Sequence, residues 1–340
     1  MKSNQSTTTE GTPTKVSVVI PVYNYARFVG DAVRSVLAQT FRDFELLVVD
    51  DGSTDNTPEV VRSFTDSRVV YLPRAHAGVS AAQNAGIRAA RGEYITILGA
   101  DDTYLPSNLE EKVAVLDSRP DIGLVCSDAS VFDERAGTII GRFWRDPGVS
   151  HYWVDPARAA RQPLRELLSR GCFIAPQATM IRRSALDEVG LFDESLPTHE
   201  DWDLFVRLLM NYRLEIIDTP LVVLRHHGTN LSGNQEKMNE GALRAIDKTL
   251  RYPSLSMEER GLLRHRLEEE LYFGRLAMKA GNSRAAVRAF AVTLRWNPWR
   301  VKVGLYLMMA LLGAPGYRAL RSWKERGRTH AISNFAEQRK

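Results

Sequence analysis

Short apolar runs alternate with segments of helical periodicity from Lys15 onward, and this alternation limits the possible folds more than any other feature of the sequence. Residues 16–20 form the first β-branched run, and residues 27–39 carry apolar side chains at helical spacing. Three more strand and helix pairs follow, at residues 44–49 and 57–64, 69–72 and 79–90, and 94–98 and 108–116. Short buried strands separated by helices predict an α/β fold with a mainly parallel sheet, whose ligands bind at the carboxyl ends of the strands.

Composition divides the chain into four segments. Residues 1–14 are rich in Ser and Thr and contain no apolar stretch, so we expect a disordered lead-in rather than a secretory signal. Residues 15–233 hold the strand and helix pattern and are expected to form the α/β domain, and residues 234–257 are expected to be a linker. Helical periodicity alone continues in residues 258–340, which predicts a helical C-terminal module with a basic tail.

Charge and cysteine content narrow the partners and the compartment. The net charge of +4 over 340 residues is modest, so no nucleic-acid partner is expected. The two cysteines, Cys126 and Cys172, lie in apolar surroundings without metal-ligand spacing, which favours reduced thiols over a disulfide or a zinc site. We therefore expect a cytoplasmic protein.

Polar loops follow three of the predicted strands, at residues 21–24, 50–55 and 99–102. None has the Gly-rich fingerprint of a dinucleotide site or the Gly-Lys-Ser/Thr ending of a P-loop. Two of them carry paired aspartates, which suit a divalent cation that bridges the protein to a diphosphate. Taken singly, each loop is also typical of an ordinary chain reversal. The functional interpretation depends on their convergence at one edge of the sheet.

These loops and the runs around them resemble the successive motifs of family 2 glycosyltransferases. The matching runs are residues 16–24, 49–55, 78–86, 92–102, 190–194, 199–204 and 225–232. The resemblance implies a GT-A fold, which is Rossmann-like, and an inverting transfer of a sugar from a nucleotide sugar, with a UDP-sugar as the expected donor. It also implies a glycan or lipid-linked glycan acceptor, as in the synthesis of cell-surface polysaccharides.

Carried over to this sequence, the resemblance assigns the donor pocket to the first two loops. Pro21, Tyr23 and Asn24 match residues that line the nucleotide pocket, and Asp51 matches the carboxylate that accepts a hydrogen bond from the base. Asp50, beside it, is expected to shape the turn.

The same resemblance assigns a cation site to the third loop. Asp101 and Asp102 match the acidic motif of the family, in which one carboxylate faces the donor and the other binds Mn²⁺ or Mg²⁺. We expect Asp102 to be the principal ligand, with Asp101 shared between the donor and the metal. Two positions depart from the family pattern, because Gly99 replaces the usual first acid and Gln83 replaces a frequent arginine.

A second acidic cluster begins the predicted helix at residues 198–203. Thr198 is a candidate N-cap, and carboxylates in a first helical turn are favoured by the helix dipole, so local structure alone explains them. The resemblance instead matches Asp201 to the base that removes the proton from the acceptor hydroxyl, with Glu200 as the alternative base.

Histidines and an arginine follow the apolar run at residues 216–224. A lone histidine there is ordinarily a surface or capping residue. By resemblance, His227 matches the histidine that approaches the metal or the diphosphate, and Arg225 is a candidate for neutralising phosphate charge. His226 is expected to be structural.

The remaining segments carry weaker signals. Residues 127–175 match no motif, and the aromatic side chains of Trp144, Tyr152 and Trp153 either stack on acceptor sugars or pack in the core. Residues 272–290 are similar to one tetratricopeptide-like hairpin, too few for a peptide-binding array, so a helical cap is favoured. The apolar residues 301–314, followed by a basic segment, predict either contact with the inner membrane surface or a core helix.

Two other function classes compete with the glycosyltransferase hypothesis. A catalytically degenerate nucleotide- or glycan-binding module of the same fold should lack one of Asp101, Asp102, Asp201 or His227. All four are present, but the departure at Gly99 keeps this alternative open. A nucleotidyltransferase should carry a Gly-rich basic loop after the first strand, and residues 21–24 are not of that kind.

Overall fold

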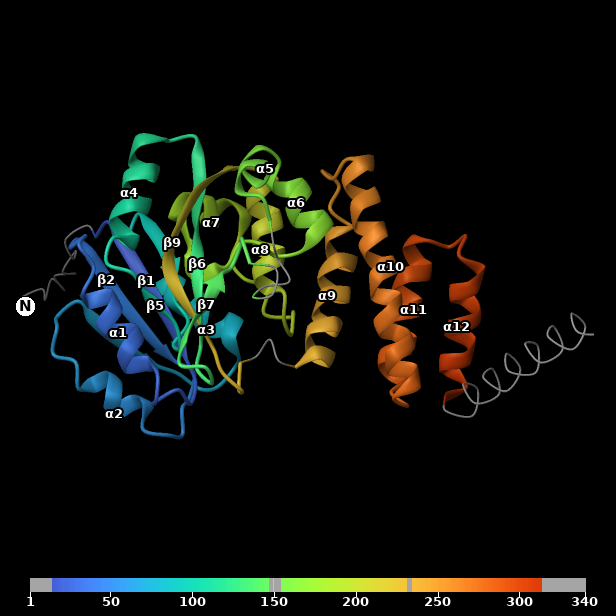
Figure 1. Cartoon of the computed structure of the whole chain (residues 1–340), viewed down its shortest axis with the longest axis horizontal. Coiled ribbons are helices and arrows are strands. Elements are labelled where there is room, and N and C mark those ends of the chain that lie inside the picture. Colours follow the sequence, from blue (N-terminus) through green and yellow to red (C-terminus); the bar gives the residue numbers. More distant parts are fainter. Residues whose placement is uncertain (1–13, 147–148, 150–153, 231–233, 314–340) are drawn as a thin grey trace, which may run out of the picture. The chain divides into compact units, whose positions relative to one another are not determined.

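The computed structural model describes residues 14–146, 149, 154–230 and 234–313, and these form two compact units (Figure 1). The first unit comprises the residues up to Ser195 together with Glu200–Gly233, and the second comprises Leu196–His199 and the residues from Asn234 onward. The predicted lead-in before residue 14, Tyr152, Trp153 and the basic tail after residue 313 lie outside the described residues.

The first unit contains every strand of the described chain. The strands are β1 (Val16–Val22), β2 (Phe44–Asp50), β3 (Val69–Pro73), β4 (Tyr94–Ile97), β5 (Thr103–Tyr104), β6 (Ile122–Asp133), β7 (Thr138–Arg142), β8 (Thr179–Arg182) and β9 (Arg213–His226). The helices are α1 (Val29–Leu37), α2 (Thr57–Arg62), α3 (Val79–Ala89), α4 (Asn108–Ser118), α5 (Pro156–Arg161), α6 (Pro163–Arg170), the 3-10 turn η1 (Pro176–Ala178), α7 (Arg183–Val189) and α8 (Glu200–Leu209). The four strand and helix pairs predicted from the sequence are confirmed.

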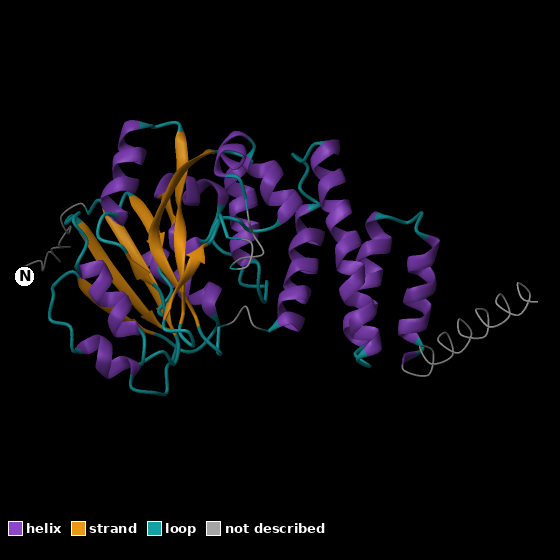
Figure 2. Ribbon diagram, in the orientation of Figure 1, coloured by secondary structure: helices purple, strands orange, loops and turns teal. Residues whose placement is uncertain are grey.

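The strands form one mixed sheet flanked by helices (Figure 2). Their order is β3-β2-β1-β4-β8-β6-β9-β5, with β7 paired to β6. Strands β1 to β4 are parallel, β8 runs antiparallel between β4 and β6, and β9 is parallel to β6. The α/β prediction is confirmed, and the strands with antiparallel pairing, β5, β7 and β8, lie outside the four predicted strand and helix pairs.

Strand β1 is buried on both faces, as its unbroken apolar run predicts. Val18 and Ile20 belong to the core that includes α1 and α4. On the other face, α3 lies so close that a Cβ on Gly86 would be 2.3 Å from Val19 Cγ1 and 3.0 Å from Val49 Cγ2. The helices thus fix the sheet from both sides and leave the strand ends to carry the loops.

The second unit is helical, with α9 (Gln235–Thr249), α10 (Met257–Lys279), α11 (Ser283–Trp296) and α12 (Val301–Leu311). Residues 234–257, which we expected to be a linker, contain α9. Asn234 caps this helix by accepting a hydrogen bond from Lys237 N, and its short apolar side chains, such as Ala245 and Ile246, are buried. Charged residues between them hide the helical pattern in the sequence.

Helices α10, α11 and α12 pack in succession, as expected for a helical hairpin and a following helix. Helix α12 has two different faces. Val303, Met309 and Ala310 are buried with Phe290 of α11 in one core cluster. The opposite face is exposed: Val301 has a fractional exposure of 83%, and the other large apolar side chains on this face are about half exposed or more. Among the described helices, none is both long and apolar enough to cross a membrane.

Candidate active site

Asn24 connects the loops that follow β1 and β2. It adopts a φ of 57°, in the left-handed region that asparagine tolerates better than most residues. Its Oδ1 accepts a hydrogen bond from Thr54 N at 2.7 Å, and its N–H donates to Ser53 Oγ at 2.9 Å. Pro21 lies within β1, opposite Val49 of β2. Both predicted donor residues therefore shape the edge on which a nucleotide would bind.

Asp51 holds the loop that leads into α3. Its side chain is only 3% exposed, and its carboxylate accepts hydrogen bonds from Ala77 N at 3.1 Å and Gly78 N at 2.8 Å. His76 Nδ1 and Arg74 Nε lie 2.8 Å and 3.4 Å from its oxygens. Because these donors already surround the carboxylate, the predicted contact with a nucleotide base requires this loop to move.

Tyr23 and His76 form an aromatic pair beside Asp51. Their ring centroids are 4.2 Å apart with an angle of 25° between the planes, and Tyr23 is 41% exposed. An exposed flat ring of this kind is a suitable surface for a planar base to stack on. His76 carried no motif signal and was missed by the sequence analysis.

Asp101 is in direct contact with His227. Asp101 Oδ2 lies 3.0 Å from His227 Nε2, and Asn230 Nδ2 donates to the same oxygen at 3.1 Å. The other ring nitrogen, Nδ1, lies 2.9 Å from Thr229 Oγ1, and the imidazole stacks on Phe28 at 4.8 Å. The structure thus joins two predicted metal ligands and holds the histidine ring in one orientation.

Asp102 lies next to this pair and is almost completely buried. Its Oδ1 accepts a hydrogen bond from the backbone N–H of Arg225 at 2.9 Å. Burial raises the pKa of Asp102 well above its usual range, the charge of Asp101 raises it further, and Arg225 opposes both effects. Burial, with the charges of both aspartates, also raises the pKa of Tyr25 to about 12. Two adjacent carboxylates in this setting favour a bound proton or cation.

The Arg225 guanidinium lies against the same loop. Its Nε donates to Asp101 O at 3.1 Å, and a terminal nitrogen is 3.4 Å from Asp31 Oδ2. The rings of Phe28 and Phe132 lie 5.3 Å and 5.5 Å from its central carbon. The predicted phosphate partner is therefore positioned beside the acidic motif, with one loose ion pair to Asp31.

The residues predicted to bind metal fit a cation, although no three acidic, histidine or cysteine side chains form a complete cage in the part of the chain that the structure describes. Carboxylate oxygens with one imidazole suit Mn²⁺ or Mg²⁺. The 3.0 Å between Asp101 Oδ2 and His227 Nε2 matches the separation of about 3 Å between adjacent ligands of an octahedral cation. Thr229 N donates a hydrogen bond to His227 Nδ1 at 3.3 Å and Thr229 Oγ1 lies 2.9 Å from the same nitrogen, so these contacts orient the ring with Nε2 toward Asp101.

Gly99 leaves room for the carboxylates of Asp101 and Asp102. A Cβ at this position would lie 2.5 Å from Asp102 Oδ2 and 2.9 Å from Asp101 Oδ1. The acid that the family often has here would therefore displace both carboxylates from their present positions. Gln83, the other departure from the pattern, is buried on α3, and its Oε1 has no hydrogen-bond partner among the described residues.

Glu200 and Asp201 begin α8 and are both partly exposed. Burial, followed by the charge of Asp201, raises the pKa of Glu200 to about 7. Burial also raises the pKa of Asp201, and hydrogen bonds from Trp202 N and the Cys172 thiol oppose that rise. Adjacent carboxylates whose pKa values are raised are suited to general base catalysis.

The N-cap expected at Thr198 was wrong. Helix α8 begins at Glu200, and His199 before it has a φ of 64°. Thr198 Oγ1 instead donates to Lys237 O of α9 at 3.2 Å, within the second unit. The hydroxyl expected to cap α8 thus makes its hydrogen bond within the second unit.

Direct contacts divide the predicted residues into three groups. Asp101, Asp102, Arg225 and His227 form the first, Tyr23 and Asp51 meet through His76 in the second, and Glu200 and Asp201 are neighbours in the third. Trp144, considered as a sugar-stacking residue, is buried and belongs to the core. Asn230 and Cys172 were missed because Asp101 and Asp201, which they contact, are distant in sequence, and Thr229 was missed although it lies two positions from His227.

The sequence matches the family model described as Glycosyl transferase family 2 over residues 17–190. An uncharacterized glycosyltransferase of Rickettsia felis is 31% identical over 228 residues, which cover 66% of this chain and 36% of that protein. One from Rickettsia typhi is 30% identical over 242 residues, covering 68% of this chain and 73% of that protein. This chain therefore spans little more than a third of the Rickettsia felis protein.

Two solved structures share the fold at low sequence identity. S. aureus TarS 1–349 in complex with UDP-GlcNAc has a TM-score of 0.61 and 18% identity, over 90% of this chain and 92% of that chain. The mannosyltransferase PcManGT from Pyrobaculum calidifontis, in complex with GDP-Man and Mn²⁺, has a TM-score of 0.53 and 20% identity. The match covers 89% of this chain and 87% of that chain. These likenesses confirm the fold predicted from the sequence.

Proposed function

Because the chain belongs to glycosyl transferase family 2, we propose that it is an inverting enzyme that moves a sugar from a UDP-sugar to a hydroxyl group of a glycan or lipid-linked glycan. The observation that carries this proposal is the contact of Asp101, Asp102, Arg225 and His227 at the strand ends. Their carboxylates, imidazole and guanidinium form one cluster with the chemistry needed to bind a cation and a diphosphate.

Donor binding is assigned to the aromatic pair and the acidic cluster. The exposed ring of Tyr23 offers a stacking surface for the base, and Pro21 and Asn24 shape the loop beside it. Asp51 contacts the base after its loop shifts. TarS, which shares the fold, has been solved with UDP-GlcNAc, and this favours a UDP-sugar here.

A divalent cation, Mn²⁺ or Mg²⁺, is assigned to Asp102, Asp101 and His227. When bound, it supplies positive charge that offsets the diphosphate of the donor. Arg225 adds a planar donor for a phosphate oxygen when its loose pair with Asp31 opens. PcManGT, which shares the fold, has been solved with Mn²⁺.

Asp201 is assigned as the base. It takes the proton of the acceptor hydroxyl while that oxygen attacks the anomeric carbon from the face opposite the diphosphate. The bond between the anomeric carbon and the phosphate oxygen breaks, its electron pair leaves with the nucleoside diphosphate, and the configuration inverts. Arg225 and His227 stabilise the charge that develops on the leaving group.

Two variants separate the base from the cation site. Asp201→Asn should lower transfer by about 100-fold or more while UDP binding in Mn²⁺ stays nearly unchanged. Asp102→Ala should weaken Mn²⁺-dependent UDP binding, measured by calorimetry with and without EDTA. Asp187→Asn, at an exposed carboxylate of α7, is the control. Full transfer by Asp201→Asn would refute the assignment of the base, and UDP-sugar binding without any transfer by the unaltered enzyme would favour a degenerate module.

The exposed face of α12 is assigned to the inner surface of the membrane, where lipid-linked acceptors lie. This face comprises Val301, Leu305, Met308, Leu311 and Leu312, with the exposed Trp299 before it. Residues 271–324, which enclose it, contain ten Lys and Arg residues and no Asp or Glu. An apolar face with basic flanks binds anionic lipid surfaces. We therefore propose a cytoplasmic enzyme that is peripheral on that membrane.

Vesicle sedimentation tests this contact. The full chain should pellet with phosphatidylglycerol vesicles, less so in high salt, and not with phosphatidylcholine alone. Leu305→Glu with Met308→Glu should abolish pelleting. The matched control replaces Ile139 and Ile140, two exposed apolar residues of β7, by Glu and should pellet normally. Equal pelleting of both double variants would contradict the assignment.

A further inference from the structure

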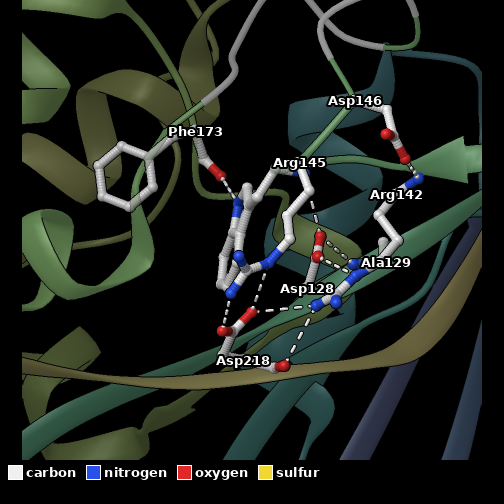
Figure 3. A network of polar contacts seen from close by, with 8 residues as sticks. Asp128, Ala129, Arg142, Arg145, Asp146, Phe173 and Asp218 are labelled. Atoms are coloured by element: carbon white, nitrogen blue, oxygen red, sulfur yellow. Dashed lines mark hydrogen bonds and ion pairs between the residues drawn. The ribbon is translucent and has the colours of Figure 1, made fainter.

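Asp128 of β6 is a fully buried carboxylate that the proposed mechanism does not use. Its Oδ1 accepts a hydrogen bond from Trp144 N at 3.1 Å, and its Oδ2 accepts one from Arg142 Nε at 2.8 Å. Arg142 also donates to Asp218 Oδ1 of β9 at 3.0 Å, and Arg145 pairs with the same carboxylate (Figure 3). The chain that follows β7 is therefore tied to both β6 and β9.

Trp144 extends this network toward the base. Its indole is buried, and Nε1 donates to Phe173 O at 2.8 Å. Phe173 is itself buried, so its carbonyl would lose its partner if the indole N–H were removed. A side chain on one segment thus holds the backbone of residues 171–174, which are close to α8.

Cys172, the neighbour of Phe173, lies between two acceptors. Its Sγ is 3.2 Å from Ile174 O and 3.9 Å from Asp201 Oδ2. A thiol is a weak hydrogen-bond donor, and a donor next to a carboxylate favours its ionised form. A series of hydrogen bonds and neighbouring residues therefore leads from Asp128 through Trp144, Phe173 and Cys172 to Asp201, the carboxylate assigned as the base.

Strand register places Asp128 at the same edge of the sheet as the acidic cluster. Ile181 of β8 pairs with Ile95 of β4 on one side and with Leu124 of β6 on the other. Four residues after Ile95 the chain reaches Gly99, just beyond the end of β4, and four residues after Leu124 it reaches Asp128 of β6. The network is thus built into the catalytic edge rather than into the distant end of the sheet.

We propose that Cys172 is a positioning residue for Asp201 and that Trp144, anchored by Asp128, holds it in place. The thiol keeps the Asp201 carboxylate oriented and ionised for proton removal. This inference rests on the proposed role of Asp201 as the base. The titratable groups beside Asp201 are Cys172, which acts on its pKa, and Glu200 on the same helix, whose own pKa the Asp201 charge raises.

Alkylation of Cys172 by iodoacetamide tests the contact without any substrate. Cys126 is fully buried, and burial raises its pKa to about 12, so the reaction reports on Cys172. Asp201→Asn removes a negative charge beside the thiol and should speed alkylation at pH 7 about threefold, whereas Asp187→Asn should not. An unchanged rate in Asp201→Asn would overturn the proposal.

Trp144→Phe tests the support of Cys172. This variant keeps a ring in the core but cannot donate to Phe173 O. In a chain that already carries Trp144→Phe, Asp201→Asn should change the alkylation rate less than it does in the unaltered chain. The effects of two substitutions that act through the same contact are not additive. Trp296→Phe, which loses a similar bond to Asp247 Oδ1 of 2.8 Å in the second unit, is the control and should leave the threefold effect intact. If Asp201→Asn still speeds alkylation threefold in the Trp144→Phe chain, Trp144 does not support Cys172.

The pH dependence of UDP release from UDP-GlcNAc, with water as acceptor, supplies the catalytic readout. Cys172→Ala should move the acid limb of this profile up by about half a pH unit, which lowers the activity below the limb about threefold. Cys172→Ser keeps a hydrogen-bond donor and should return the limb to its original pH. An unmoved limb would refute the positioning role. If instead Asp201→Asn keeps its activity, the assignment of the base fails, while the alkylation result still reports whether Cys172 contacts Asp201.

Discussion

Replacement of Glu200 by Gln is the sharpest test of which carboxylate acts as the base. Glu200 and Asp201 lie side by side in the first turn of α8. Burial and then the charge of Asp201 raise the pKa of Glu200 from 4.5 to about 7, so Glu200 is partly ionised near neutral pH. The substitution removes that charge with almost no change in size, and Asp201 stays in place.

The expected result follows from the order in which the two carboxyl groups ionise. Burial is the larger cause of the raised pKa of Glu200, so the charge of Asp201 accounts for the smaller part, about one pH unit or about 1.4 kcal/mol. Because the charge of Asp201 raises the pKa of Glu200, Asp201 is ionised before Glu200 loses its proton. Asp201 therefore titrates beside a neutral Glu200, which Gln mimics, and the acid limb of the activity profile should stay in place.

The measurement is the pH profile of transfer at saturating donor. Along the acid limb and above it, Glu200→Gln should keep the activity of the original enzyme to within about twofold. A loss of about 100-fold at every pH would refute this reasoning and assign the base to Glu200. A limb that moves down by about one pH unit would also refute it, because Glu200 would then be charged before Asp201 ionises.

Three further predictions concern stability and the cation site. Lys112 is buried, and its amino group has no hydrogen-bond partner among the described residues. Burial lowers its pKa from 10.5 to about 7, so the unfolded chain binds more protons between these values and the free energy of unfolding should rise with pH from 7 to 10.5. Lys112→Met should raise the free energy of unfolding by about 2–4 kcal/mol at pH 7 and by little at pH 10.5, as denaturant titrations would report. Gly86→Ala should cost about 1–3 kcal/mol and lower the Tm, because its Cβ would clash with β1, whereas Gly261→Ala, in open space on α10, should not destabilise. Asn230→Ala, which removes a donor to Asp101, should weaken Mn²⁺-dependent UDP binding about tenfold in calorimetry.

Local periodicity predicted the first half of the sheet well. Strands β1 to β4 and helices α1 to α4 follow apolar runs and helical stripes that need no knowledge of distant residues. The same approach missed α5 and α6, although Asp155 caps α5 through Ala157 N and Pro163 begins α6, both recognisable starting signals. It also missed β6 and β7, since no motif drew attention to residues 127–175.

The candidate site was predicted as a set of residues but not as a set of contacts. The Asp101 and His227 side chains are 126 positions apart, and Asn230 joins them from a triplet that resembles a glycosylation signal. No local pattern could pair Cys172 with Asp201, because residue type and spacing carry no information on which segments a fold brings together. His76 was missed for the same reason.

The sequence by itself determined the alternation of strands and helices, the positions where acidic loops leave the sheet, and the family to which the chain belongs. Hydrophobic periodicity and motif spacing are local properties, so they survive without a structure. Only the tertiary structure decided that Asp101 faces His227, that Asp102 is held by the backbone of Arg225, and that a thiol lies beside Asp201. These contacts depend on β9 lying next to β6 and β5, and on residues 171–174 passing close to α8, which strand pairing and packing across the whole unit establish.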